Sequence, residues 1–574
     1  MTAGVREEPR EAVRPRTPRR LPLPTLLALL VGFAGVGYRL ALLFADVPPT
    51  NSDEATMGLA ALHIARGDGF PVWFYGQAYM GTLEAYLAAP LVALAGPSVL
   101  VLRLPTLALY ALFLLLSWRL TRRLGGDRWY ALLVVAVLAL GADRVVKNQL
   151  IAGGGYPELN PAGAALALLT VGLCVNGPGA RLPRWAAWGL VSGVLLWVDP
   201  LILPYVLTLG VLLVAWRWRE LAGRAGMVLA GTLLLGAAPM LADSIRHGRN
   251  PMAAVLAAGG AGSPAEWADR LYGALVLGPP LAMGFCSPGR CATWQLWWAV
   301  AFPVLLVLAA LTAWHALRRA SGDPGSAERV SAGVRLALLG GAAGVLAAYA
   351  VSNAAGQTPI ESSRYLSCLA VAVPALLWPL WQAARPLAEV AASDRPAERQ
   401  FAEVAVSEEG GYRHLPEVES IKATGGRAAG RTARVAGVGA LAVLAGVLGT
   451  GVAATVDVVR AAPAVHAEAD RHRSLVDTLG ALDVRNVRGG YWTCNRLTFA
   501  TGENVVCAVV DDDLTPGFDR LPAYRREVSA DPDAAWVAPA GSPLAARLDE
   551  RVGAESGALD VVTVAGWRIY LPRR

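Results

Sequence analysis

Charged residues are scarce in this chain. Only 17% of its 574 residues are Asp, Glu, Lys or Arg, whereas 55% are hydrophobic and the mean hydropathy is +0.43. This composition excludes an ordinary soluble protein and is typical of membrane proteins. The chain has no acidic or basic block long enough to indicate nucleic acid as a partner. It also has no Gly-x-Gly-x-x-Gly motif opening a βαβ unit.

Cysteine is rare too, with six residues in the whole chain. Two lie in apolar runs, and the other four form close pairs, Cys286 with Cys291 and Cys494 with Cys507. Both pairs fall in segments that we predict to face an oxidising compartment, so two local disulfides are expected. Four cysteines permit three connectivities, however, and free buried thiols are the alternative.

Long apolar runs, in contrast, are abundant. A bilayer core of about 30 Å needs roughly 20 apolar residues per helix. The runs that qualify begin near Leu21, Val99, Trp129, Pro161, Trp185, Gly226, Trp294, Val334, Tyr365 and Val435. The run 185–216 is too long for one helix and has basic flanks, so we expect two short crossings hinged at Val198 to Pro200. The sequence therefore predicts about eleven transmembrane helices.

Arginine sets the expected orientation. With a cytoplasmic N-terminus and eleven crossings, every Arg-rich connection falls inside the cell. The predicted organisation is a cytoplasmic basic tail 1–20, a transmembrane catalytic domain 21–384 with a first outer loop 48–98, a disordered cytoplasmic loop 385–433, a last transmembrane helix 434–456 and an extracytoplasmic α/β domain 457–574. The fold class is thus mainly α, a multi-pass protein of the cell (plasma) membrane. Strand-like runs such as "VVCAVVD" carry the α/β assignment.

The first outer loop opens with paired acids, Asp53 and Glu54, in "NSDEATM". Adjacent side chains point roughly 100° apart on a helix, so at most one acid is a working base. The alternative is local: Ser52 or Asp53 caps a helix, and Glu54 favours its first turn. The runs "TMGLAALHIARG" and "AYLAAPLVALAG" are expected to lie as helices at the membrane surface.

Other polar residues of the outer loops are candidates for substrate binding. These are Glu54, Tyr75, Gln77, Tyr79, Glu84, Tyr156, Glu158, Asp199 and Tyr365. Their alternative role is capping or hydrogen bonding between loops. A divalent metal is compatible with the carboxylates, although no ligand spacing requires one. In the C-terminal domain, Tyr491, Trp492 and Arg496 are either glycan contacts or core residues.

Three arginines near the outer boundary could hold a phosphate. Arg39 interrupts the first apolar run, Arg103 follows the start of the second, and Arg364 ends an outer loop in "SSRY". One guanidinium group can bind two phosphate oxygens at once through parallel hydrogen bonds. The alternative is that each side chain extends to the membrane interface.

Taken in order, these motifs resemble the GT-C superfamily of membrane glycosyltransferases, nearest the branch containing protein O-mannosyltransferases and lipid A aminoarabinose transferase (glycosyltransferase family 39-like). The resemblance rests on "YRLALLFADVPPTNSDEA", "GDGFPVWFYGQAYMGTLEAYLAAPL", "LRLPTL" and "RYL", and it covers roughly Leu21 to Leu380. The sequence departs from that branch in "FYGQAYMGTLE" and in its C-terminal domain, so donor sugar and acceptor stay open.

The resemblance implies an inverting transfer of a sugar from a polyprenyl-phosphate donor to a lipid, glycan or protein acceptor outside the cytoplasm. Asp53 resembles the base that deprotonates the acceptor hydroxyl. Arg364, with Arg39 and Arg103, resembles the group that binds the carrier phosphate.

Two other functions compete with this interpretation. A secondary transporter also has many spans with a few buried charges, but its polar sites usually lie near the bilayer midplane on broken helices. A non-catalytic membrane scaffold or sensor would use its outer domain to bind a partner, and its acid cluster would be dispensable.

Overall fold

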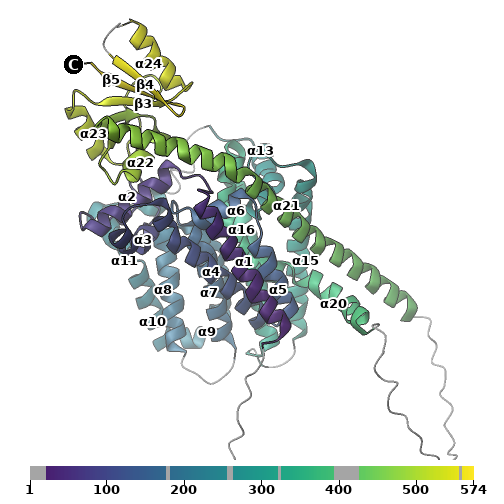
Figure 1. Ribbon diagram of the computed structural model, residues 1–574. Helices are drawn as coiled ribbons and strands as arrows, with labels where there is room; N and C mark the ends of the chain where they lie inside the picture. The colour runs from purple at the N-terminus through teal and green to yellow at the C-terminus, as the bar shows by residue number, and fades with distance from the viewer. Residues whose placement is uncertain are drawn as a thin grey trace, which may run out of the picture.

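The structure is a computed structural model that describes residues 21–175, 181–254, 263–320, 323, 325–393, 426–554 and 559–573. The predicted basic tail 1–20 and residues 394–425 of the predicted cytoplasmic loop lie outside the described residues. Helices make up most of the described chain (Figure 1).

The helices of the first half are α1 (Leu23–Phe44), α2 (Ser52–Arg66), α3 (Leu83–Ala95), α4 (Val99–Arg123), α5 (Arg128–Ala139), α6 (Asp143–Leu150), α7 (Tyr156–Cys174), α8 (Leu182–Val198), η1 (Pro200–Ile202), α9 (Leu203–Leu221), α10 (Arg224–Gly236) and α11 (Ala238–His247). Those that follow are α13 (Trp267–Leu271), η2 (Tyr272–Leu277), α14 (Gly278–Ala282), η3 (Thr293–Trp297), α15 (Trp298–Arg319), α16 (Ala327–Val351), α17 (Asn353–Gln357), α18 (Pro359–Ser362), η4 (Ser363–Ala372), α19 (Val373–Leu376), α20 (Trp378–Ser393) and α21 (Gly426–Ala481).

Seven segments of the described chain are long and apolar enough to cross a membrane. They are Leu23–Phe44, Val99–Arg123, Pro200–Leu221, Thr293–Arg319, Ala327–Val351, Pro359–Leu387 and Arg434–Ala481. Two bent pairs, α5 with α6 at 91° and α10 with α11 at 62°, raise the number to as many as nine. The chain is therefore a multi-pass membrane protein. The predicted number of eleven crossings and their orientation stay predictions.

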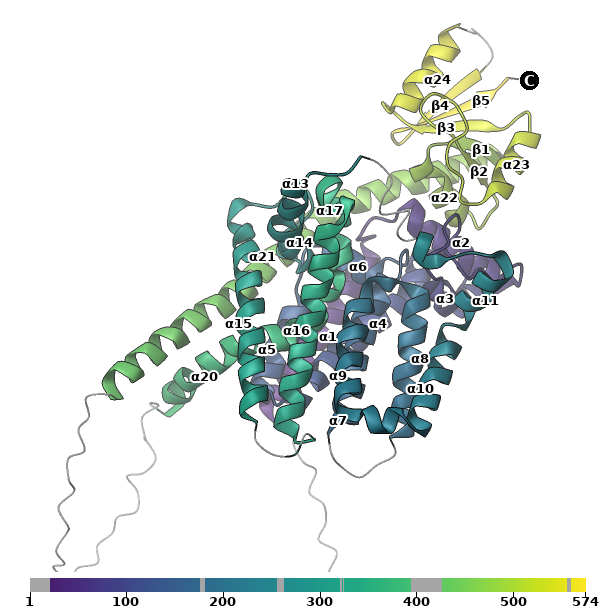
Figure 2. The same ribbon diagram turned by 180° about the vertical axis from the view of Figure 1, so that it is seen from behind.

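Glycine allows a close helix contact between α8 and α10. A Cβ at Gly193 would lie 2.1 Å from the carbonyl oxygen of Leu233, and one at Gly236 would lie 2.4 Å from that of Leu190. Larger residues would force these backbones apart, and small residues at such crossings are a feature of membrane helices. Figure 2 shows α8 and α10 side by side.

The paired helices α2 and α3, which fall in the predicted first outer loop, lie at the end of the bundle that meets the C-terminal domain (Figure 1). The expectation that α2 lies beside lipid is wrong: residues 54–62 are buried, because α3 and the C-terminal helix α22 (Tyr491–Ala500) pack against them. The expected N-cap is also wrong by one position. Asn51 is the cap, and its side chain accepts a hydrogen bond from the Glu54 N–H at 2.9 Å.

The C-terminal part follows α21, which runs without interruption across the predicted boundary at residue 456. It contains β1 (Asn486–Gly489), α22, β2 (Val506–Val509), α23 (Pro522–Ala530), β3 (Ala535–Pro539), α24 (Pro543–Ala554), β4 (Leu559–Val564) and β5 (Trp567–Pro572). The strand order is β2-β1-β3-β5-β4, with β1 parallel to β2 and β3, and with β5 antiparallel to β3 and β4. The predicted fold class, mainly α with a small α/β C-terminal domain, is confirmed.

Two disulfides are present in this structure. Cys494 on α22 bonds to Cys507 on β2, inside the C-terminal domain, and Cys286 bonds to Cys291 in the loop after α14. The bond between α22 and β2 fixes the helix that touches α2 to the sheet behind it.

Candidate active site

Asp53 lies in the first turn of α2, where its carboxylate faces the C-terminal domain. Its Oδ1 accepts hydrogen bonds from the Tyr491 hydroxyl at 2.6 Å and from Arg520 Nη2 at 2.9 Å. The Asp53 side chain is 26% exposed. Burial and the nearby charge of Asp53 raise the pKa of Tyr491 far above its usual value, so this phenol stays protonated and donates.

Glu54, the adjacent acid, points to a different partner. It forms a two-bond ion pair with Arg103, with Nε to Oε1 and Nη2 to Oε2 both at 2.6 Å, and Arg103 Nη1 also donates to the Pro48 carbonyl at 2.8 Å. The two side chains are 0% and 1% exposed. The structure therefore gives no support to substrate binding by Glu54 or phosphate binding by Arg103, because the carboxylate and the guanidinium already bind each other.

Arg39 is also buried and engaged within the protein. Its Nε donates to Gln149 Oε1 at 2.7 Å, its Nη1 donates to the Ala139 carbonyl at 2.9 Å, and its guanidinium lies 3.9 Å from the Tyr110 ring centroid. This position gives no support to the predicted phosphate role, since the group neither reaches the surface nor faces Asp53. Arg39 links α1 to α5 and α6 instead.

Arg364 lies near the start of η4, which packs against α7. Tyr156, Tyr365 and Asp53 all act on it electrostatically, and its guanidinium lies 5.5 Å from the Tyr365 ring centroid. Its Nε is buried without a hydrogen-bond partner among the described residues. Of the three predicted arginines, Arg364 is thus the one whose charge acts on Asp53.

Helix α6 adds two cations to this region that the sequence did not single out. Arg144 and Lys147 each interact electrostatically with Arg364, and Arg144 Nη2 donates to the Ile360 carbonyl at 2.8 Å. The signal was present in "DRVVKNQL", a short polar helix directly after an apolar run. The 91° bend between α5 and α6 turns this helix toward η4, and no local sequence feature predicted that direction.

The "GGG" loop, Gly153 to Gly155, holds the next group of acids. The Gly155 N–H donates to Glu84 Oε1 at 3.0 Å, and a Cβ at Gly153 would lie 3.3 Å from the Glu54 backbone nitrogen. Gly155 has φ +75°, and a Cβ there would meet Val198. The loop therefore packs directly beneath the start of α2, and a close backbone approach and a left-handed φ together account for the glycines.

Three acids gather around that loop. Glu84, Glu158 and Asp199 act on one another electrostatically. Burial raises the pKa of Glu84 to about 8, although the N–H groups of the glycine loop lower it. One Glu84 oxygen and both Glu158 oxygens have no hydrogen-bond partner among the described residues. The glycine loop thus lies between Glu84 and the start of α2, where Asp53 is located. The role of these acids in substrate binding stays a prediction.

The polar and aromatic residues between α2 and α3, Tyr75, Gln77 and Tyr79, also have contacts or charges near this region. The Tyr75 hydroxyl hydrogen-bonds His63 Nδ1 at 2.7 Å, and its carbonyl accepts from Arg520 at 3.1 Å. Tyr79 interacts electrostatically with Tyr365, Arg520 and Arg364. Gln77 Oε1 is buried without a partner among the described residues.

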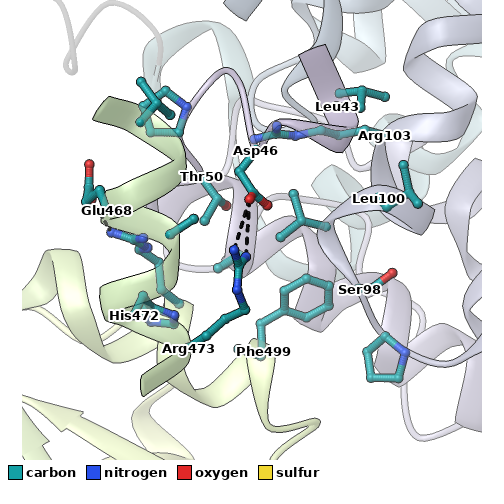
Figure 3. Close-up of a pocket in the computed structure, with 18 residues that line it drawn as sticks. Leu43, Asp46, Thr50, Ser98, Leu100, Arg103, Glu468, His472, Arg473 and Phe499 are labelled. Atoms are coloured by element: carbon teal, nitrogen blue, oxygen red, sulfur yellow. Dashed lines mark hydrogen bonds and ion pairs between the residues drawn. The ribbon is translucent and has the colours of Figure 1, made fainter. Parts of the chain in front are cut away.

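A cavity of about 340 Å³ lies apart from these residues, between α1, α4, α21 and α22 (Figure 3). Asp46 and Arg473 form an ion pair across it. Arg103 contributes to its wall, but Asp53 and Arg364 do not. No group of three or more His, Cys, Asp or Glu in the described part of the chain could hold a metal ion.

The solved structure of ArnT from Cupriavidus metallidurans bound to undecaprenyl phosphate matches this fold with a TM-score of 0.53 at 15% sequence identity, over 96% of this chain and 97% of that one. This chain has a GT-C fold. The archaeal oligosaccharyltransferase AglB from Archaeoglobus fulgidus, in complex with an inhibitory peptide and a dolichol-phosphate, has a lower TM-score of 0.44. Its sequence identity is 12%, and the match covers 90% of this chain and 69% of that one. No protein-family model and no curated protein matches the chain.

Proposed function

We propose that this protein is an inverting glycosyltransferase that moves a sugar from a polyprenyl-phosphate donor to an acceptor at the outer face of the membrane. Asp53 is its general base, and Arg364 binds the donor phosphate. The observation that carries the proposal is the electrostatic interaction between the partly exposed Asp53 carboxylate and the partly buried Arg364 guanidinium.

The arrangement suits a single displacement. The acceptor hydroxyl attacks the anomeric carbon from the face opposite the phosphate, and its proton passes to the Asp53 carboxylate. A new C–O bond forms as the bond between the anomeric carbon and the phosphate oxygen breaks. The polyprenyl phosphate leaves with the electron pair, and a guanidinium stabilises its charge. Attack from the opposite face inverts the anomeric configuration.

The cations around Arg364 support the assignment of the donor side. Arg144 and Lys147 approach it from α6, and they are balanced in part by Asp143 and Glu361. Clustered like charges are costly in a buried site unless an anion joins them. A phosphate on a membrane-bound carrier supplies that anion, and the carrier's hydrocarbon chain reaches the site by diffusion in the bilayer.

Turnover of purified protein on a panel of polyprenyl-phosphate sugars tests the proposal. We predict that Asp53→Asn loses about 10²- to 10⁴-fold in transfer, which is the range that a positioned base contributes. The matched control is Asp46→Asn, because Asp46 is also a partly exposed acid that pairs with an arginine of the C-terminal part, Arg473, but at the separate cavity. It should transfer at close to the normal rate.

Undiminished transfer by Asp53→Asn would remove that residue from the mechanism. Flux of a solute through proteoliposomes without any lipid-linked sugar would favour a transporter instead. An acid cluster that proves wholly dispensable would favour a scaffold or sensor.

A further inference from the structure

The C-terminal domain inserts an arginine into the site of the proposed base. Arg520, in the loop before α23, donates from Nη2 to Asp53 at 2.9 Å, and its side chain is 8% exposed. We propose that Arg520, with Tyr491, is a positioning residue that holds the Asp53 carboxylate for acceptor deprotonation, so that the active site is complete only when the C-terminal domain is docked on α2. This inference rests on the proposed glycosyltransferase function.

Residues of both the membrane part and the C-terminal domain fix the Arg520 guanidinium. From the membrane part, the Phe74 ring lies under it at 4.6 Å, and the Tyr75 carbonyl accepts from Nη1 at 3.1 Å. From the C-terminal domain, the Phe518 ring centroid lies 5.5 Å away, and the Tyr491 hydroxyl accepts from Nε. A cation held over aromatic faces and by several hydrogen bonds has little freedom to move.

The two donors bind the same oxygen of Asp53. Tyr491 and Arg520 both donate to Oδ1. Among the described residues, none donates a hydrogen bond to Oδ2. One oxygen is thereby anchored, and the other is left to take the proton of an acceptor hydroxyl. Fixing a carboxylate in this way suits a general base, because misplacement by about 1 Å can cost roughly 100-fold in rate.

The docking surface between α2 and α22 is built to hold this arrangement. The Ser52 hydroxyl donates to the Tyr491 carbonyl, one residue from Asp53, and Asn495 Nδ2 donates to Thr56 Oγ1 at 2.9 Å. Ser52 and Thr56 lie about one turn apart on α2, one before and one after Asp53. The position of Tyr491 therefore depends on side chains of the membrane part.

A second anchor lies at the other end of α2. Glu503 accepts from His63 Nε2 at 2.9 Å and pairs with Arg66, and Tyr524 donates to it at 2.6 Å. Burial raises the pKa of Glu503, but the hydrogen bonds from His63 and Tyr524 outweigh it and lower the pKa to about 2. This anchor stays charged at ordinary pH and does not touch Asp53, so it offers a control for docking alone.

The test compares Arg520→Met, Arg520→Lys and Tyr491→Phe with Arg66→Met in the full-length protein. We measure transfer over a range of pH, and hydrogen exchange of α2 reports docking. Tyr491, Arg520 and Arg364 all act on Asp53. Loss of a neighbouring cation disfavours the ionised carboxylate.

We expect Arg520→Met to lower transfer by roughly 10- to 100-fold and to move the acidic limb of the pH–rate profile to higher pH. Arg520→Lys should restore the limb but only part of the rate, and Tyr491→Phe should lower the rate with a smaller change in the limb. Arg66→Met should leave the profile in place.

The proposal is overturned if Arg520→Met has the normal rate and profile, or if it loses only as much rate as Arg66→Met with an unchanged profile, since its effect would then be docking alone. Either result leaves the glycosyltransferase function standing when Asp53→Asn is inactive. If Asp53→Asn is active, the proposed function itself fails.

Discussion

Asp53 and Glu54 are neighbours in sequence, but their side chains have different partners and different exposure. In the first turn of α2, Asp53 points to Arg520 and Tyr491 of the C-terminal domain, whereas Glu54 forms a closed ion pair with Arg103. Helical geometry predicted that the two acids would diverge, but the sequence did not show which acid would be exposed. That choice depends on Arg103, 49 residues away.

The buried pair of Glu54 and Arg103 should matter for stability. Glu54→Gln leaves the arginine charge buried and unpaired, which costs about 3–5 kcal/mol in comparable cases. Thermal unfolding in detergent measures the loss. The control is Arg66→Ala, at a pair with one side chain 44% exposed, where about 1 kcal/mol or less is expected. Equal effects of the two changes would contradict a structural role for the buried pair.

Glu84 should make stability depend on pH. Burial raises its pKa from 4.5 in the unfolded chain to about 8 in the folded protein, so its contribution is complete below about 4.5 and is lost as the pH increases through 8. The melting temperature should therefore fall between pH 5 and pH 8, and Glu84→Gln should flatten this fall. An identical pH dependence in the variant would show that Glu84 is not the group responsible.

Helix α2 is the element that joins the two parts of the protein. Its apolar residues predicted a helix at the lipid surface, yet the structure buries it under α3 and α22. Hydropathy identified the helix but not its cover, because lipid and protein side chains bury apolar surface alike. The local sequence also gave no sign that the α5–α6 run would bend by 91°.

Close packing of α2 against α22 depends on Gly58. A Cβ there would lie 2.5 Å from Cζ of Phe499, so Gly58→Val should push α22 away and carry Tyr491 off Asp53. We expect faster hydrogen exchange in α2 and a loss of transfer of roughly tenfold or more. Gly69→Val is the matched control, since nothing lies within 4 Å of its added Cβ. Normal exchange and transfer in the Gly58 variant would contradict the docking account.

The apolar runs predicted most of the long helices, and the strand-like runs after residue 500 predicted β2, β4 and β5 but not β1 or β3. The candidate site was only partly predictable from the sequence. Asp53, Arg364 and Tyr491 were each singled out, but no pattern predicted that Tyr491 and Arg520, 438 and 467 residues further along the chain, would contact Asp53. Contacts that distant arise from tertiary packing, which no local pattern encodes.

We propose that Asp53 and Arg364 form one site for a polyprenyl-phosphate sugar. An experimental structure of the full chain with bound polyprenyl phosphate would reveal whether they do. We predict phosphate oxygens within hydrogen-bond distance of the Arg364 guanidinium, on the side that faces Asp53. A phosphate bound instead in the cavity beside Arg473, with Arg364 untouched, would contradict the account.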